Sequence, residues 1–307
     1  MDFDWNEEQR AFRARVRDFL GANLPPDWEA LAHGPGSEAQ TVFSKQFCGA
    51  LAEAGLLVPH WPAEWGGRDA DPWIAFILAE EMWAAGEPRG GQYMNVNWIG
   101  PTLMRFGSEQ QQQRYIPPMA RGETLWCQGF SEPEAGSDLA SLRTRADRDG
   151  DLYRVNGQKI WTSYADMADK IFALVRTDRD APKHLGISFM LIDMQRPGVS
   201  TKPIRLISGA SPFCETFFDN VKVPKDGAIV GEQNRGWDVA KYLLTHEREM
   251  IGGGGGGLLS GSTLADMIGT MDADAAADPV IRAEAMELEV DAMAFALTME
   301  RYRDMAE

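Results

Sequence analysis

The stretch GFSEPEAGSDLAS (129–141) follows directly on a change in the pattern of the chain. Before about Leu125, apolar residues recur at helical spacing, whereas the residues that follow favour strands and tight turns. Asp149-Gly150 and Asn156-Gly157 are turn signals between alternating runs. Three later runs are typical of strands: IFALVRT (171–177), GISFMLIDM (186–194) and ETFFDNVKVP (215–224). We therefore predict a small β domain that begins beside the quoted stretch.

Taken from its residues alone, the quoted stretch is the end of a strand that runs into a Gly/Ser turn. The backbone N–H groups near Ala135, Gly136 and Ser137 could hold a phosphate or the polar edge of a flavin. The hydroxyls of Ser131 and Ser137 could add to such a site. The alternative is an ordinary hydrogen-bonded loop, because Gly/Ser loops are common.

Helical spacing of apolar residues appears on both sides of the predicted β domain. After it, the spacing returns at Trp237 and again in a long helix-forming segment that runs to the last residue. Before it, predicted helices lie around 12–20, 43–54, 74–83 and 98–106, and the run 108–123 is a short polar helix followed by a loop. The predicted fold class is mixed α and β, with an N-terminal helical domain (1–124), a middle β domain (125–234) and a C-terminal helical bundle (235–307).

The composition excludes several classes of protein. The chain has 46 acidic and 30 basic residues and a net charge of −16, so we expect neither nucleic acid nor an anionic membrane surface as a partner. Its three cysteines lie far apart, which favours neither a disulfide framework nor a metal site. The acidic first residues are wrong for a signal peptide, and no apolar run is long enough to cross a bilayer. We predict a reduced, cytoplasmic protein.

GFSEPEAGSD (129–138), followed by NGQKIWTS (156–163), resembles the signature pair of the acyl-CoA dehydrogenase family. WPAEWGG (61–67) and the run 107–123 are similar to that family's N-terminal domain. The resemblance extends from Asp4 to about Gly257 and implies an N-terminal helical domain, a middle β domain and a C-terminal four-helix bundle. It also implies a flavoprotein oxidoreductase of lipid metabolism and β-oxidation, which binds FAD, oxidises acyl-CoA to trans-2-enoyl-CoA and passes electrons to an electron-transferring flavoprotein.

The resemblance implies a flavin site made by two segments of the β domain. Trp161 would offer a flat face to the isoalloxazine ring, although a core position is the alternative for any tryptophan. Ser131 and Ser163 would bond the reactive edge of the flavin, and Ser137 would lie between the cofactor and CoA. Gln128 departs from the aromatic residue often found at its position. The implied cofactor residues are Gln128, Phe130, Ser131, Gly136, Ser137, Trp161, Thr162 and Ser163.

The implied reaction needs a base that removes the α-proton of the thioester. A carboxylate can do so where a dry pocket raises its pKa. In the family this base is a glutamate, either late in the chain or just before an arginine on the first long helix of the C-terminal bundle. Here the second position is Glu247, followed by Arg248, and the resemblance implies Arg248 and Thr245 as substrate contacts. The alternative is that Glu247 and Glu249 flank an arginine on a solvated helix face.

Six consecutive glycines (252–257) follow Glu247 closely. In a helix interior they would cost about 5–6 kcal/mol relative to alanine, so a linker is one interpretation. The other is a helix that gave up side chains, since Gly254 and Gly255 would share the face of Glu247. On that interpretation they bind substrate by leaving room for a bulky, polycyclic or branched acyl group.

The chain also departs from the family pattern. An arginine and an aromatic-glycine step are missing between 258 and 280, which makes a hetero-oligomer an alternative to a homo-oligomer, as a dimer or a tetramer. Glu307 stands inside helix-forming sequence, so we expect a C-terminal portion to be missing and FAD binding to be weak or lost. Two other functions stay open: a non-catalytic partner subunit of a heteromeric dehydrogenase, and an oxygen-using flavin oxidase on the same fold.

Overall fold

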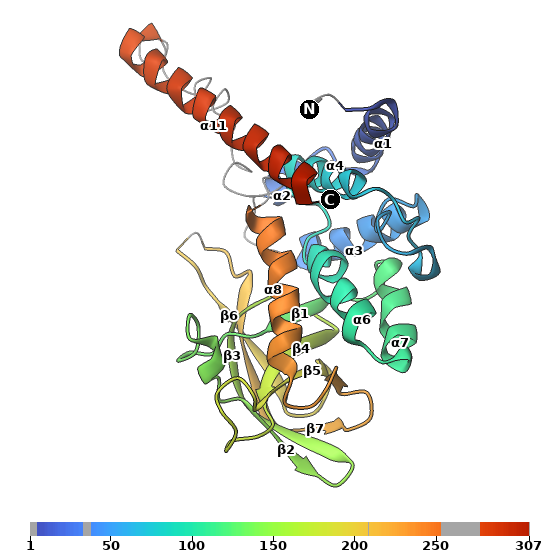
Figure 1. Ribbon diagram of the computed structural model, residues 1–307, viewed down its shortest axis with the longest axis vertical. Helices are drawn as coiled ribbons and strands as arrows, with labels where there is room; N and C mark the ends of the chain where they lie inside the picture. The colour runs from blue at the N-terminus through green and yellow to red at the C-terminus, as the bar shows by residue number, and fades with distance from the viewer. Residues whose placement is uncertain (1–4, 33–37, 208, 253–276, 307) are drawn as a thin grey trace.

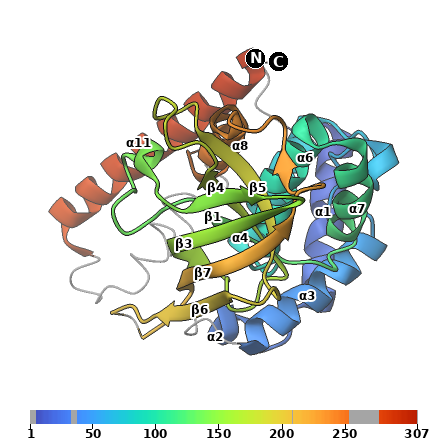
Figure 2. The same cartoon turned by 90° about the horizontal axis from the view of Figure 1, so that it is seen from below.

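The computed structural model of the 307-residue chain describes residues 5–32, 38–207, 209–252 and 277–306. Helices come first, a β-sheet follows, and helices α8 and α11 come last (Figure 1). The view from below shows the N-terminal helices along one side of the sheet (Figure 2). The predicted order of helices, strands and helices is confirmed.

The N-terminal helices form where the apolar spacing predicts them. Helix α1 begins with a capping box between Asn6 and Gln9 and buries Phe12, Val16 and Leu20. The helices are α1 (Glu7–Asn23), α2 (Trp28–Ala32), α3 (Glu38–Glu53), α4 (Pro72–Ala84), α5 (Gln92–Met94), α6 (Gly100–Phe106) and α7 (Glu109–Ala120), with a 3₁₀ turn at Ala63–Trp65.

Between α5 and α6 lies a π-helical turn, η2 (Asn95–Ile99), so the helix predicted over 98–106 begins earlier, at Gln92. The buried amide of Asn95 explains this turn. It donates to the carbonyl of Thr124 at 2.5 Å and accepts from the backbone N–H of Trp126 at 3.0 Å. The turn therefore fastens the helical part to the start of the first strand, beside the cavity described below.

The sheet has the strand order β6-β7-β3-β2-β4-β5-β8, and β1 pairs in parallel with β4 outside this path. The three predicted strand runs correspond to β4, β5 and β7, which confirms them. A 3₁₀ turn, η3 (Leu139–Ser141), follows β1. The strands are β1 (Trp126–Gly129), β2 (Arg145–Asp149), β3 (Leu152–Ser163), β4 (Lys170–Arg176), β5 (Ile187–Asp193), β6 (Val199–Ile204), β7 (Phe213–Pro224) and β8 (Ile229–Val230).

Of the two predicted turns, Asp149-Gly150 does connect β2 to β3, but the prediction for Asn156-Gly157 is wrong. These two residues lie inside β3, at an irregularity in its pairing with β7. Gly157 has φ +150°, and a Cβ built there would lie 2.6 Å from the Cα of Thr144. The glycine therefore permits a close approach between two chain segments rather than a reversal.

The five central residues of β4 (171–175) are all apolar and buried, because both faces of the strand are covered there. Phe172 and Leu174 belong to the core shared with the helices, whereas Ile171, Ala173 and Val175 belong to a second core within the β part. The sheet is thus the wall between the two cores. Residues at its end can present side chains toward the helices from a rigid backbone.

Helix α8 (Gly236–Gly252) packs against β5, α6 and the π-helical turn, and buries Val239, Ala240 and Leu243. Helix α11 (Pro279–Ala306) follows beyond residues that lie outside the described part of the chain. Those residues include Gly254 and Gly255, so the interpretation of the glycine run has no structural description.

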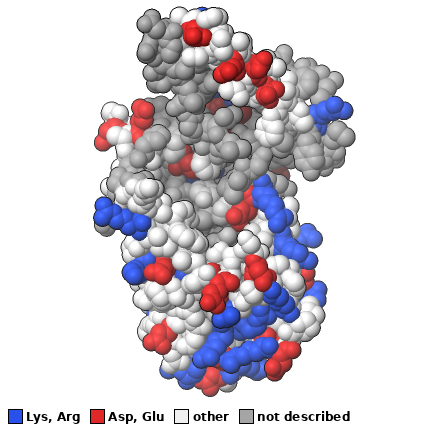
Figure 3. Space-filling view, turned by 90° about the vertical axis from the view of Figure 1, so that its left-hand side faces the viewer, with Lys and Arg blue, Asp and Glu red and all other residues white. Residues whose placement is uncertain are grey.

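The surface charge is uneven. Figure 3 shows lysines and arginines gathered over the β part of one face, although the chain carries a net charge of −16. None of the helices in the described ranges has both the length and the apolar character needed to cross a membrane.

Candidate active site

A cavity of about 210 Å³ lies where α8, the π-helical turn, β1 and the end of β3 meet. It brings together six of the residues that the sequence predicts for the site, from segments far apart in the chain. Its lining consists of Met94, Trp98, Gln128, Phe130, Ser131, Ile160, Trp161, Ser163 and Glu247.

Trp161 reaches the cavity because the sheet is irregular at its position. The pairing of β3 with β7 shifts between Lys159 and Thr162, and Trp161 takes a positive φ of 59°. Such a bulge re-aims a side chain, and the indole is 53% exposed. Its edge-on neighbour is Phe213, with ring centroids 6.0 Å apart. Thr162 lies fully buried, outside the lining of the cavity.

A buried ion pair fixes the loop that carries Ser131, one of the residues that line the cavity. The Nζ of Lys159 donates to Glu132 Oε1 at 2.8 Å and to the carbonyl of Phe130 at 3.1 Å. Glu132 also accepts from the backbone N–H groups of Arg143 at 2.6 Å and Thr144 at 2.9 Å. The carboxylate of Glu132 therefore accepts hydrogen bonds from the side chain of Lys159 and from the backbone of Arg143 and Thr144.

Electrostatics in this pair favour the charged forms of both groups at neutral pH. Burial lowers the pKa of Lys159 to about 8, against the opposing effect of Glu132. Burial alone would raise the pKa of Glu132, but the Lys159 charge and the hydrogen bonds from Lys159, Arg143 and Thr144 bring it below its usual value. Sequence reasoning missed both residues, although they stand inside the two quoted motifs.

Glu247 faces the cavity from α8 and is held differently. Its Oε2 accepts one hydrogen bond, at 3.3 Å, from Nε2 of Gln128 on β1. Burial raises the pKa of Glu247 above its ordinary value, whereas the bond from Gln128 and the charge of Arg248 oppose that rise. The other end of the amide, Oε1 of Gln128, is buried and has no partner among the described residues.

Other predicted site residues lie apart from this cavity. Gly136 and Ser137 are exposed on the outer part of the loop. Thr245 is exposed and donates to the carbonyl of Lys241 at 3.0 Å, and Arg248 is exposed as well. By contrast, Phe130 does line the cavity, although it is almost wholly buried, with its ring edge-on to Phe172 and Phe189.

Met94 and Trp98 line the cavity without having been predicted. The spacing of apolar residues indicates a helix near Trp98 but carries no signal for which face meets the sheet. The π-helical turn decides that orientation, and it depends on the distant contacts of Asn95.

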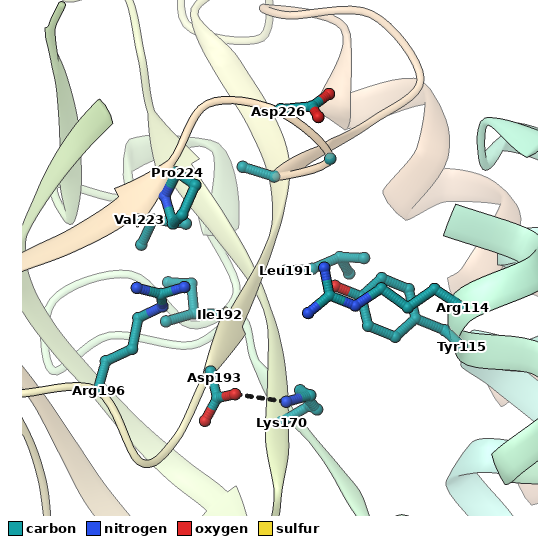
Figure 4. A pocket seen from close by; sticks show the side chains of 12 residues that line it. Arg114, Tyr115, Lys170, Leu191, Ile192, Asp193, Arg196, Val223, Pro224 and Asp226 are labelled. Carbon is teal, nitrogen blue, oxygen red and sulfur yellow. Dashed lines mark hydrogen bonds and ion pairs between the residues drawn. The ribbon is translucent and has the colours of Figure 1, made fainter. Parts of the chain in front are cut away.

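A smaller cavity of about 70 Å³ lies between α7 and the sheet, and Figure 4 shows its side chains. Lys170 and Asp193 pair within it at 2.5 Å, and Arg196 donates to the carbonyl of Lys222 at 2.9 Å. Nearby, Gln111 of α7 donates to the carbonyls of Gly227 and Ile229. The two bonds from Gln111 fasten α7 to the segment around β8, and none of the predicted site residues lines this cavity.

Two family profiles match the chain. The one described as acyl-CoA dehydrogenase, N-terminal domain, matches residues 6–123, and the one described as acyl-CoA dehydrogenase, middle domain, matches residues 127–221. They cover the helices before the sheet and most of the strands, including β1 and β3, which line the cavity.

Individual proteins agree with these profiles. The acyl-CoA dehydrogenase IpdE1 of Mycobacterium tuberculosis is 40% identical over 79% of this chain, and the chain spans 63% of that relative's length. A solved structure described as the Tcur3481-Tcur3483 steroid ACAD has a TM-score of 0.84 and 32% identity, covering 100% of this chain and 79% of that one. The ChsE4-ChsE5 complex from M. tuberculosis has a TM-score of 0.74 and 29% identity, covering 97% of this chain and 78% of that one.

Proposed function

The chain belongs to the acyl-CoA dehydrogenase family, and from this premise we propose that it oxidises an acyl-CoA thioester to the trans-2-enoyl-CoA. The observation that carries the proposal is the half-buried carboxylate of Glu247, which lines the same cavity as the exposed indole of Trp161 and the residues Ser131 and Ser163. A base and a surface for a flat cofactor thus share one space.

FAD is the cofactor we infer, since the family is in general FAD-dependent. The cavity fits a flat group with polar edges: it offers the half-exposed indole of Trp161 and the hydroxyls of Ser131 and Ser163. Ser131, Trp161 and Ser163 would hold it. When bound, FAD supplies the acceptor for the hydride that leaves the β-carbon.

Glu247 is the base in this proposal. Burial raises its pKa toward the working range of a general base. Its carboxylate takes the α-proton, so that the Cα–H bond breaks and an O–H bond forms. The electron pair left on the α-carbon becomes the Cα=Cβ bond as the β-hydrogen departs with its own pair.

The proposed substrate is a thioester with a bulky acyl group. One of the similar solved structures is a steroid ACAD, and we extend a bulky substrate of that kind to the present chain. The solved ChsE4-ChsE5 structure is a complex of two named chains, which supports a hetero-oligomer here. We propose an electron-transferring flavoprotein as the acceptor that reoxidises the enzyme.

Anaerobic titration of the FAD-reconstituted protein with acyl-CoA thioesters tests the proposal. The panel runs from short, straight acyl groups to steroid side-chain thioesters, and the measurement is the loss of visible flavin absorbance. We expect a bulky thioester to bleach the flavin in the native protein. Glu247→Gln should bind the same thioester but reduce flavin about 10²–10⁴ times more slowly, because a general base contributes about that factor.

The outcomes separate the competing functions. Flavin that binds and is never bleached, even after a co-expressed partner chain is added, contradicts the dehydrogenase. Bleaching that appears only in the presence of the partner assigns the chain to a shared active site. Rapid reoxidation of the reduced flavin by air, at the rate of turnover, would instead favour the oxidase.

A further inference from the structure

We propose that Gln128 is the positioning residue for the base, and that its side-chain amide holds Glu247 in the cavity both before and after proton transfer. The proposal rests on the function inferred above, in which Glu247 removes the α-proton. It assigns to Gln128 a role toward a protein side chain, which differs from the flavin contact that the sequence predicts.

The position of Gln128 is rigid. It is paired with Phe172 on the neighbouring strand β4, and the residue two before it, Trp126, is tied through its backbone N–H to Asn95. Neighbouring side chains alternate across the sheet, so Cys127 points into the inner core of the β part while Gln128 points toward α8. A strand therefore presents the amide to Glu247 from a fixed backbone.

The contacts of the amide are incomplete in one respect that the proposal explains. Nε2 donates to Glu247 Oε2 at 3.3 Å, while Oε1 is buried without a partner among the described residues. A buried acceptor left unpaired is costly unless another state of the site uses it. Protonated Glu247 carries the O–H donor that this oxygen lacks.

Amide chemistry suits a partner that must serve two states. Toward the carboxylate, the NH₂ end donates; toward the carboxylic acid, the oxygen end accepts. The two ends exchange by rotation about the last side-chain torsion, which is broad and roughly two-fold, so the backbone of β1 need not move. Unlike a lysine or a second carboxylate, the amide does this without gaining or losing a proton of its own.

Among the described residues, few charges act on Glu247. Arg248 lies beside it on α8 and is exposed, and Tyr93 faces it from α5 with a pKa that burial keeps far above the usual value, so that it stays neutral. Within the described part of the chain, Gln128 is thus the cavity residue that hydrogen-bonds to this carboxylate and favours its charged form. The bond from the amide to the charged carboxylate is stronger than its bond to the neutral acid, so removal of the amide costs the charged form more. The base should therefore hold its proton to higher pH.

Gln128→Met is the test variant, because methionine has a similar length but cannot hydrogen-bond. Gln158→Met is the matched control: Gln158 is also half-buried on a strand and donates to a glutamate, Glu215, at 2.9 Å, but it lies outside the cavity. The first measurement is the pH profile of anaerobic flavin reduction. In Gln128→Met the rising limb should move to higher pH, with a rate about fivefold to tenfold lower on that limb, the factor expected for one lost hydrogen bond.

A second measurement does not depend on catalysis. Carbon-13 NMR of full-length protein labelled at the glutamate side-chain carboxyls follows the titration of Glu247, with Glu247→Gln assigning its resonance. The resonance should titrate at higher pH in Gln128→Met than in the native protein, and at an unchanged pH in Gln158→Met. Should thioesters fail to bleach the native flavin, the proposed function fails, whereas this titration still decides whether Gln128 governs Glu247.

Gln128→Glu guards against a variant that merely folds badly. It keeps the size of the side chain but places a second carboxyl beside the base, and two carboxyls that share a site raise the pKa of one of them. Its rising limb should therefore lie above that of Gln128→Met. Limbs and titrations that coincide in the native protein and in both Gln128 variants would overturn the proposal.

Discussion

Two glutamates beside the cavity, Glu132 and Glu247, carry the same carboxyl group, but their pKa values are shifted in opposite directions. Glu132 receives Lys159 and two backbone N–H groups, and its pKa lies below the usual value. Glu247 accepts one long hydrogen bond from a neutral amide, and burial raises its pKa. A buried carboxylate with a full set of hydrogen-bond donors holds separate chain segments together, and we call such a carboxylate a fastener. One with few donors is ready to take a proton, which is the property that the proposed base requires.

The largest effect should follow when Glu132 loses its ion-pair partner, Lys159. Lys159→Met leaves the Glu132 carboxylate buried beside a thioether, and breaking a buried ion pair from one side costs about 3–5 kcal/mol of unfolding free energy. Urea denaturation measures this. Arg121→Met is the control, because its pair with Glu123 is exposed and screened by solvent and should contribute little to stability. Equal losses in the two variants would mean that the buried pair is not a fastener.

The next effect separates the two glutamates by pH. Glu132 has a depressed folded pKa, so its stabilising contribution exists at neutral pH and disappears as the pH falls through that value. Glu247 has a raised folded pKa, so its contribution exists at acid pH and disappears as the pH rises through that value. Glu132→Gln should therefore lose about 2–3 kcal/mol at pH 7 and less in acid. Glu247→Gln should match the native protein in acid and be slightly more stable at pH 7.

Thermal unfolding of both variants from about pH 3 to pH 8 checks these opposite slopes, because Glu132 titrates below its usual value. Parallel slopes would show that the two carboxylates are in equivalent surroundings, and the distinction between fastener and base would fail.

Much of the fold was open to prediction because its periodicity is strong. The strand runs at β4 and β5 are apolar on both faces, and the Asp149-Gly150 hairpin has ordinary turn chemistry. The failure at Asn156-Gly157 has a physical cause: a glycine needed for close approach to Thr144 looks like a glycine needed for a reversal. The π-helical turn could not be predicted, since it depends on Asn95 reaching Thr124 and Trp126.

The candidate site was open to prediction where its residues stand in recognisable motifs. The structure gathers Gln128, Ser131, Trp161, Ser163 and Glu247 around one cavity. Lys159 escaped notice because a lysine in a strand is ordinarily exposed, and no local pattern announces that its ammonium group lies buried against a glutamate. Burial of a charge is a property of the folded pair, and Glu132 lies far enough upstream that spacing does not link them.

The smallest effect concerns the hydroxyl of Ser131, which lies on the loop held by the Glu132–Lys159 ion pair. Ser131 follows Phe130, whose carbonyl Lys159 holds, and its own carbonyl accepts from the N–H of Ile160 at 3.0 Å, so the backbone stays fixed when the side chain is removed. Ser131→Ala should change the unfolding free energy by less than about 0.5 kcal/mol. If the hydroxyl bonds FAD, the Kd for FAD should rise about fivefold, the equivalent of one neutral hydrogen bond. Titration of FAD fluorescence measures this, with Ser200→Ala, at an exposed position on β6, as control. Combining Ser131→Ala with Lys159→Met sharpens the comparison, because a loop that is no longer fastened cannot aim the hydroxyl. The loss of FAD affinity from Ser131→Ala should then shrink in the Lys159→Met background, and a loss of full size there would mean that the ion pair plays no part in presenting this hydroxyl to the cofactor.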